Sequence, residues 1–233
     1  MIPYVANALR ATFSIAAKCD VTIMSHFTVG TIIPDLIAGV WHGSTPVHPM
    51  PRVSYVEAAV LSVVQARGTM TVRDLNEHLN LTESGAHRAL TSLEHKGAIH
   101  HLDDSLVAVE NNSLCNLRIL AFELKMSRWR DALRQAGRYR EFAHQSYVVL
   151  DATQTRPTLQ MLNAFDAAGV GLLLQYGGFS DQAVPAAQAC PASAATIQVS
   201  RALATRAAID QRELHSRERA PLLENLEPYA LVE

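Results

Sequence analysis

The sequence predicts an α/β protein in which a mixed sheet flanked by helices is interrupted by a separate helical unit. Apolar runs rich in β-branched residues alternate with helical patterns on both sides of a central segment. The central segment instead reads as helices followed by a hairpin, and a proline-rich stretch, His42–Arg52, precedes it. We therefore expect four parts, with these boundaries: 1–52, 53–112, 113–180 and 181–233.

The N-terminal part begins with a predicted helix, Tyr4–Ala17, that has one apolar face. Two predicted strands follow, Asp20–Val29 and Thr31–Trp41. The second strand carries the dipeptide Pro34-Asp35 inside it, and a proline within such a run indicates an edge or a distortion.

The central segment shows three helix starts, each marked by a hydroxyl side chain that can cap a helix: Ser54, Thr71 and Thr82. Glycines or asparagine end these helices, at Gly68, Asn80 and Gly97. A short hairpin over Ile99–Val109 follows, and Asn111-Asn112 ends the segment. Three helices followed by a hairpin predict a winged helix-turn-helix.

The third part returns to alternating strands and helices. The near-continuous apolar run Leu117–Lys125 is typical of a central strand. The elements expected after it are a helix from a Ser127 cap through Ala143, a strand Ser146–Leu150, a helix Thr158–Ala168 and a strand Val170–Tyr176. The last part is rich in alanine and proline and then predicts a charged helix around Arg206–Arg219.

Glu123 and Lys125 stand two residues apart in the predicted central strand, so their side chains project from the same face. A strand end with a solvated ion pair would give the same pattern. Asp35 favours a site, because a carboxylate within an apolar strand is costly to bury unless it is paired or binds a metal. Two carboxylates on adjacent strands would suit Mg²⁺ or Mn²⁺.

A further polar pair, Gln135 and Tyr139, lies four residues apart on the helix after this strand and so shares one face. Pro34-Asp35, Glu123-x-Lys125 and Gln135-xxx-Tyr139 together resemble the PD-(D/E)xK nuclease superfamily, and the last pair is similar to the QxxxY element of RecB-like nucleases. The resemblance covers roughly Ile2–Trp41 and Leu117–Tyr176. It implies a restriction-endonuclease-like sheet and a Mg²⁺ or Mn²⁺ ion held by Asp35, Glu123 and the main-chain carbonyl of Leu124, with Lys125, Gln135 and Tyr139 completing the catalytic set.

Two departures from that family stand out. The gap between Asp35 and Glu123 is much longer than the family's usual spacing, and only an inserted domain explains it. Asp103 or Asp104 would fit the usual gap, but Asp-Asp-Ser is also typical of a hairpin turn. The first predicted helix lacks the acidic residue that some members use for a second metal, which favours one ion.

Candidate DNA contacts lie on two predicted helices. The helix after Lys125 is rich in arginine, which could contact phosphates or be a solvated face: Arg128, Arg130, Arg134 and Arg138. The third helix of the central segment could read a major groove or serve protein contacts, through His87, Arg88, Thr91, Ser92 and Lys96.

The formal net charge of −2 gives no overall basic field, so any DNA binding must come from such local patches. The cysteines, Cys19, Cys115 and Cys190, are isolated, which argues against a disulfide framework or a structural zinc site. No signal peptide or membrane-spanning run is recognisable, so we expect a cytoplasmic protein without membrane contact.

These features predict a metal-dependent DNA endonuclease whose winged helix positions the DNA. A homodimer would suit a double-strand cut. The alternative is a DNA-binding transcriptional regulator with an inactive nuclease-like domain. A ligand-sensing regulator is a third, weaker interpretation, because the sequence has no glycine-rich phosphate loop.

Overall fold

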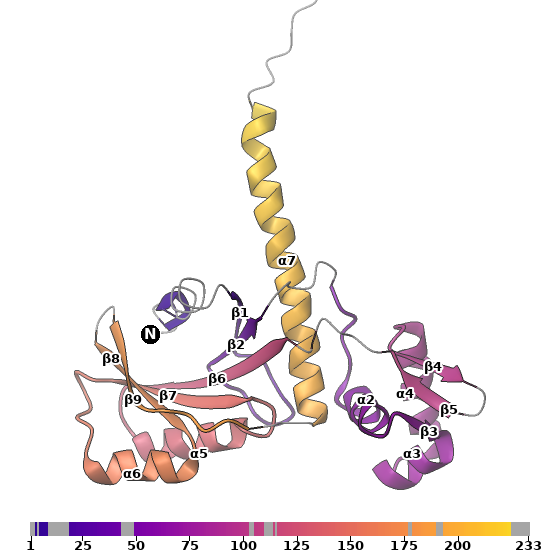
Figure 1. Ribbon diagram of the computed structural model, residues 1–233, viewed down its shortest axis with the longest axis horizontal. Helices are drawn as coiled ribbons and strands as arrows, with labels where there is room; N and C mark the ends of the chain where they lie inside the picture. Colours follow the sequence, from indigo (N-terminus) through magenta and orange to yellow (C-terminus); the bar gives the residue numbers. More distant parts are fainter. Residues whose placement is uncertain are drawn as a thin grey trace, which may run out of the picture.

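The computed structural model describes residues 3, 5–8, 19–42, 49–102, 105–109, 114, 116–176, 179–189 and 193–224, with backbone alone for 179–182 and 214–224. The described chain forms a six-stranded sheet and a three-stranded sheet, which lie apart from each other (Figure 1). This confirms the α/β class with a mixed sheet flanked by helices. The domain boundaries themselves stay predictions.

The six-stranded sheet has the order β1-β2-β6-β7-β8-β9. Its strands are β1 (Asp20–Ser25), β2 (Leu36–Trp41), β6 (Leu117–Lys125), β7 (Gln145–Asp151), β8 (Gly171–Tyr176) and β9 (Phe179–Val184). The pairs β6–β7 and β7–β8 are parallel, and the other pairs are antiparallel. The long segment between β2 and β6 therefore leaves the sheet after β2, and the chain returns to it as the neighbouring strand β6.

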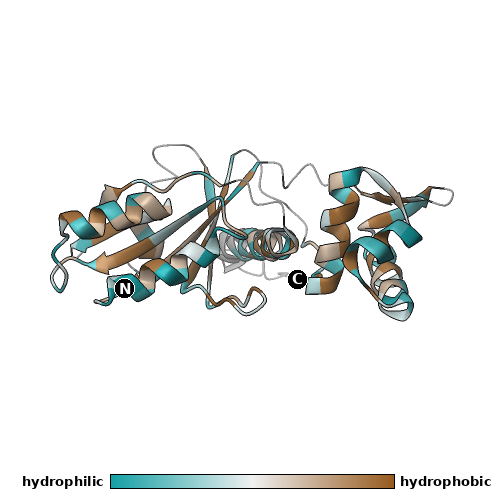
Figure 2. Ribbon diagram, turned by 90° about the horizontal axis from the view of Figure 1, so that it is seen from below, coloured by the Kyte–Doolittle hydropathy of each residue, from teal (hydrophilic) through white to brown (hydrophobic). Residues whose placement is uncertain are grey.

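Two helices, α5 (Trp129–Tyr139) and α6 (Leu159–Ala168), cover one face of this sheet (Figure 1). Their buried side chains, among them Ala136 and Phe165, join Ile37, Ile119 and Val148 of the strands in one apolar core. The opposite face forms a smaller cluster around Leu36, Phe122 and the helical residue Val5. The central strands are mostly apolar (Figure 2), as expected for strands buried on both faces.

The helical unit, which we define as residues 53–109, contains α2 (Tyr55–Arg67), α3 (Val72–Leu79) and α4 (Glu83–His95). Its three-stranded sheet has the order β3-β5-β4, with β3 (Thr69–Thr71), β4 (Ile99–Leu102) and β5 (Ser105–Ala108). The predicted caps are confirmed, because the hydroxyls of Ser54, Thr71 and Thr82 accept hydrogen bonds from the main chain of the first helical turns. The unit has its own apolar core around Leu61, Leu75 and Leu93.

The 31-residue helix α7 (Ala194–Glu224) connects the two parts. Leu203 lies in the core of the six-stranded sheet, whereas Ala194 lies in the core of the helical unit. Gly39 of β2 permits the close approach of α7, since a Cβ there would lie 3.0 Å from the Cδ1 atom of Leu203. Thr205 adds a hydrogen bond of 2.7 Å to the carbonyl of Met50.

A buried charge cluster lies at the same junction. The Glu57 carboxylate, on α2, accepts a hydrogen bond of 2.6 Å from the Lys96 ammonium at the end of α4. Bonds from Lys96, Ser92 and Ser54 outweigh the effect of burial and lower the pKa of Glu57 to about 2. Burial lowers the pKa of the Arg201 guanidinium on α7, and the negative charge of Glu57 opposes this effect. The Arg201 guanidinium donates a hydrogen bond of 3.2 Å to the Pro51 carbonyl.

Several expected boundaries are wrong. Pro34 and Asp35 precede β2 instead of lying inside it, because a short turn closed by the Val29–Ile32 bridge occupies the preceding residues. Ser127 does not cap α5, which begins after Arg128 and ends at Tyr139, before Ala143. Strands β3 and β9 were not predicted, and α7 is far longer than the expected charged helix.

Part of the expected first helix is described, since residues 5–8 are helical with Val5 and Ala6 buried; the rest of Tyr4–Ala17 lies outside the described residues. The candidates Asp103 and Asp104 and the boundary Asn111-Asn112 also lie outside them. Within the described segments, no helix has both the length and the apolar character needed to span a membrane.

Candidate functional site

The candidate site lies where β2 begins and β6 ends. The antiparallel register ends with Leu36 opposite Phe122, so Asp35, one residue before β2, lies beside the end of β6 that carries Glu123. Ile37 lies two residues after Asp35, and Ala121 lies two residues before Glu123. Both belong to the apolar core that α5 covers. By strand alternation, Glu123 projects from the same face of the sheet as Ala121, whereas Asp35 stands at a bend just before β2.

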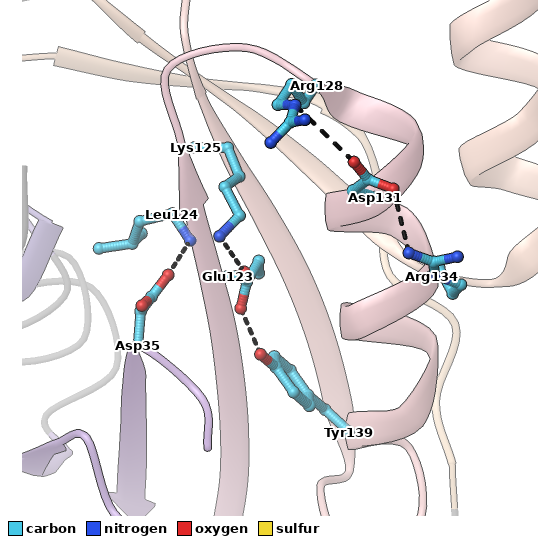
Figure 3. Close-up of polar contacts among 8 residues, drawn as sticks. All are labelled: Asp35, Glu123, Leu124, Lys125, Arg128, Asp131, Arg134 and Tyr139. Carbon is cyan, nitrogen blue, oxygen red and sulfur yellow. Dashed lines mark hydrogen bonds and ion pairs between the residues drawn. The ribbon is translucent and has the colours of Figure 1, made fainter. Parts of the chain in front are cut away.

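Asp35 is oriented by the main chain of β6. Its Oδ2 atom accepts a hydrogen bond of 2.8 Å from the N–H of Leu124 (Figure 3). The side chain thus points at the backbone of the strand that carries Glu123 and Lys125. The residue lies outside the β-ladder, and this contact takes the place of a ladder bond.

Glu123 is a buried carboxylate, only 2% exposed, with a partner at each oxygen. Oε1 lies 2.7 Å from the ammonium of Lys125, and Oε2 accepts a hydrogen bond from the Tyr139 hydroxyl (Figure 3). Lys125 is on the same strand face, and Tyr139 comes from α5, which crosses that face. A charge buried this deeply needs such partners, because an unpaired carboxylate in the core would be strongly destabilising.

The surroundings hold both partners in their protonated forms. The hydrogen bond from Lys125 to Glu123 raises the pKa of the Lys125 ammonium, against the opposing effect of burial, and the Asp35 charge adds to the rise. Burial raises the pKa of the Tyr139 hydroxyl, and the neighbouring Glu123 and Asp35 charges raise it further. Lys125 is therefore a cation, and Tyr139 a hydrogen-bond donor, at neutral pH.

The oxygen donors present here fit a hard divalent cation. Asp35 and Glu123 supply carboxylates, and the main-chain carbonyl of Leu124 points to the same side as its N–H in an extended strand. Mg²⁺ commonly uses only one or two carboxylates and keeps several waters. In the part of the chain that the structure describes, no group of three or more His, Cys, Asp and Glu side chains is arranged to hold an ion.

An open groove of about 590 Å³ runs along α5 from the site. Its lining residues are mainly basic: Lys125, Arg128, Asp131, Arg134, Gln135 and Arg138. Asp131 lies between two of the arginines, 3.1 Å from the Arg134 guanidinium and 3.9 Å from that of Arg128. The sequence pattern of alternating arginines predicted this basic surface but gave no reason to single out Asp131.

A smaller hollow of about 220 Å³ adjoins the groove and brings Gln135 and Tyr139 together, as their spacing predicted. Thr31 and Ile33, which precede Asp35, also line it, and Arg138 donates a hydrogen bond of 3.1 Å to the Thr31 hydroxyl. These two residues were not expected at the site. Their closeness to Asp35 in the sequence was the available signal.

Arg130 does not line the groove, although it was expected beside the other arginines. Its guanidinium lies over the ring of Trp129, 4.4 Å from the ring centre. Helix geometry explains this, because at about 100° per residue Arg130 lies roughly 90° from the centre of the face that carries residues 131, 134, 135 and 138.

The candidate DNA-reading residues of α4 divide into two groups. His87, Arg88 and Thr91 are exposed, and His87 and Thr91 line a groove of about 610 Å³ that also contains Glu83 and Glu94. Ser92 and Lys96 instead turn inward and bind Glu57 of α2. The structure thus gives these two residues an internal role, which the helical spacing alone did not reveal.

Comparisons with known proteins add no relative: neither the protein-family models, nor the curated proteins, nor the solved structures gave a match. Inference about function therefore depends on the geometry of the site.

Proposed function

We propose that the chain is a metal-dependent DNA endonuclease with a restriction-endonuclease-like domain of the PD-(D/E)xK type. The observation that supports this best is the pairing of Asp35 with the strand segment Glu123-Leu124-Lys125. Asp35, which precedes β2, bonds to the main chain of β6 between Glu123 and Lys125, which lie 88 and 90 positions later in the sequence. The basic groove along α5 begins at the same point.

Asp35, Glu123 and the Leu124 carbonyl would hold Mg²⁺ or Mn²⁺. Such an ion, when bound, lowers the pKa of water and neutralises charge on a phosphate. Lys125 would orient the attacking water or stabilise negative charge in the transition state. Tyr139 holds the Glu123 carboxylate in place, and Gln135 lines the approach beside it.

The groove arginines, Arg128, Arg134 and Arg138, would bind the phosphates of the substrate strand. The helical unit has the element order of a winged helix-turn-helix, and the exposed His87, Arg88 and Thr91 of α4 would meet the DNA there. The protein would work in the cytoplasm. A homodimer would place two such sites on opposite strands.

A DNA-binding regulator with an inactive nuclease-like domain is the second candidate. It is favoured by one observation: both oxygens of Glu123 already have protein partners, Lys125 and Tyr139. In that case the network would serve only to stabilise the fold. The basic groove and the helical unit would still bind DNA.

Incubation of the protein with supercoiled plasmid and with labelled single-stranded DNA separates the two candidates. The nuclease is expected to cut at least one substrate in Mg²⁺ or Mn²⁺ and neither in EDTA. Glu123→Gln keeps the shape of the side chain and is expected to abolish cutting while DNA binding persists. DNA binding without cutting by the wild-type protein in either metal would favour the regulator.

A further inference from the structure

Arg128 has an unusual backbone conformation. Its φ of 62° and ψ of 47° are left-handed, and it stands between the end of β6 and the first residue of α5. Left-handed geometry is disfavoured for residues with a Cβ, and glycine, asparagine, aspartate and histidine are the usual exceptions. The described glycines with positive φ, together with Asn80 at the end of α3 and His26, follow that rule, whereas Arg128 does not.

The fold gains little from having arginine at this position. The side chain does not cap α5, and 82% of it is exposed. Its guanidinium approaches Asp131 only to 3.9 Å, and exposed pairs of this kind contribute little to stability. Glycine would adopt the same backbone without strain, so stability alone does not account for arginine here.

The position of the side chain points to a ligand. Arg128 and Lys125 line the same end of the groove along α5 (Figure 3). The left-handed residue turns the chain sharply from β6 into α5, and it is the first arginine of the groove after the candidate catalytic lysine. Strained residues persist where function requires them.

We propose that Arg128 binds a phosphate of the nucleic-acid strand next to the phosphate that lies at Lys125, and that the strained backbone is retained because it sets the guanidinium there. The ligand depends on the proposed function, since the strand is its substrate. The link between backbone strain and phosphate binding goes beyond that function, and it makes a separate prediction about stability.

The test compares Arg128→Gly with Arg128→Ala. Both remove the guanidinium, but only glycine relieves the strain. We expect Arg128→Gly to raise Tm by roughly 2–4 °C above Arg128→Ala, as expected for removing about 1 kcal/mol of strain from a chain of this size. Asp131→Asn measures what the exposed ion pair contributes to Tm.

Nucleic-acid binding is measured in EDTA with a fluorescent oligonucleotide, single-stranded or duplex, so that no cleavage occurs. Both Arg128 variants should bind about tenfold more weakly, as for the loss of one charged hydrogen-bonding contact. The slope of log affinity against log salt should fall in magnitude by about 0.7–0.9, which corresponds to one phosphate contact. Arg130→Ala, which removes an arginine outside the groove, should bind as the wild type does.

An Arg128→Gly variant no more stable than Arg128→Ala would overturn the proposal, because the relief of strain would then not exceed the entropy that glycine adds to the unfolded chain. Higher stability of Arg128→Gly with unchanged affinity and salt slope would also overturn it, because the guanidinium would then not bind phosphate. If both effects occur in a protein that never cuts DNA, the proposed nuclease function fails while the assignment of Arg128 stands.

Discussion

The Asp35 carboxylate accepts a 2.8 Å hydrogen bond from the main-chain N–H of Leu124, and this contact ties the start of β2 to the end of β6. The Asp35 carboxylate has two separable roles. One is structural, because the bond replaces a missing ladder contact. The other is electrostatic, because the negative charge lies beside Lys125 and Tyr139 and affects the pKa of both.

Asp35→Asn should separate these roles. The amide oxygen can still accept the bond from Leu124, so Tm should change by less than about 2 °C. The charge is lost, and with it the expected stabilisation of the fold by Mn²⁺, measured as the rise in Tm on adding the metal. Asp35→Ala, the matched control, removes the anchor as well and should lower Tm without metal. An unchanged Mn²⁺ response in Asp35→Asn would exclude Asp35 as a ligand.

Lys125→Met should destabilise the protein without metal and make it more responsive to metal. The buried Glu123 loses its cationic partner, at a cost of about 1–3 kcal/mol. A divalent cation no longer competes with the ammonium, so Mn²⁺ should raise Tm more than in the wild type. Cleavage should fall roughly 10²-fold or more. Wild-type cleavage by the variant in saturating Mn²⁺ would exclude Lys125 from the proposed catalytic set.

Glu57 should make stability depend on acid pH. Its pKa is lowered from 4.5 to about 2, so its contribution is complete above about pH 4.5 and disappears as the pH falls towards 2. Linkage gives roughly 3 kcal/mol for a shift of that size. In urea unfolding measured from pH 6 to pH 2, Glu57→Gln should be less stable at pH 6 and show a shallower loss. Parallel curves for the two proteins would contradict this role.

Gly39→Ala should loosen the packing of α7. The added methyl would lie 2.9 Å from Cδ1 of Leu117 and 3.0 Å from Cδ1 of Leu203, so both side chains must shift, at a cost of about 1–3 kcal/mol. Gly137→Ala is the control, because nothing lies within 4 Å of the Cβ that alanine would add there and alanine favours a helix. Thermal unfolding should show a lower Tm for the first variant and an equal or higher Tm for the second.

The segment 53–112 should gain stability from α7. Ala194 is part of the core of the helical unit, and Ile197 packs against it. A version that carries residues 193–213 through a flexible linker should unfold at higher urea than the bare segment. Equal midpoints would mean that α7 only covers a core that is already complete.

Local signals in the sequence predicted much of the fold. The three hydroxyl caps of the helical unit are each set by a neighbouring turn, so their positions could be predicted from a few residues. The central strand was evident from its continuous apolar run. Strand β9 and the full length of α7 were missed because sequence periodicity does not reveal structure that depends on packing. For α7, such packing is the close approach of Leu203 to Gly39.

The site was predictable in its residue types but not in its contacts. Strand alternation put Glu123 and Lys125 on one face, and helical spacing did the same for Gln135 and Tyr139. Nothing local indicated that Tyr139 would bind Glu123, or that Lys96 would turn towards Glu57. Both bonds join elements whose mutual orientation depends on the whole core. The left-handed conformation of Arg128 could not be predicted either, because it depends on how α5 is placed relative to β6.

The insertion between β2 and β6 bears on the order of folding. Trp41 and Leu117 are neighbours in the sheet, and every residue of the helical unit lies between them in the chain. If that segment were still unfolded, joining the two strands would close a very long flexible loop, with a corresponding loss of chain entropy. Because contacts between residues near in sequence form faster than distant ones, we expect the helical unit to form first. In that order the intervening chain is shorter and stiffer when the two strands pair, so we expect the β2–β6 pairing, and with it the contact between Asp35 and Leu124, to form late.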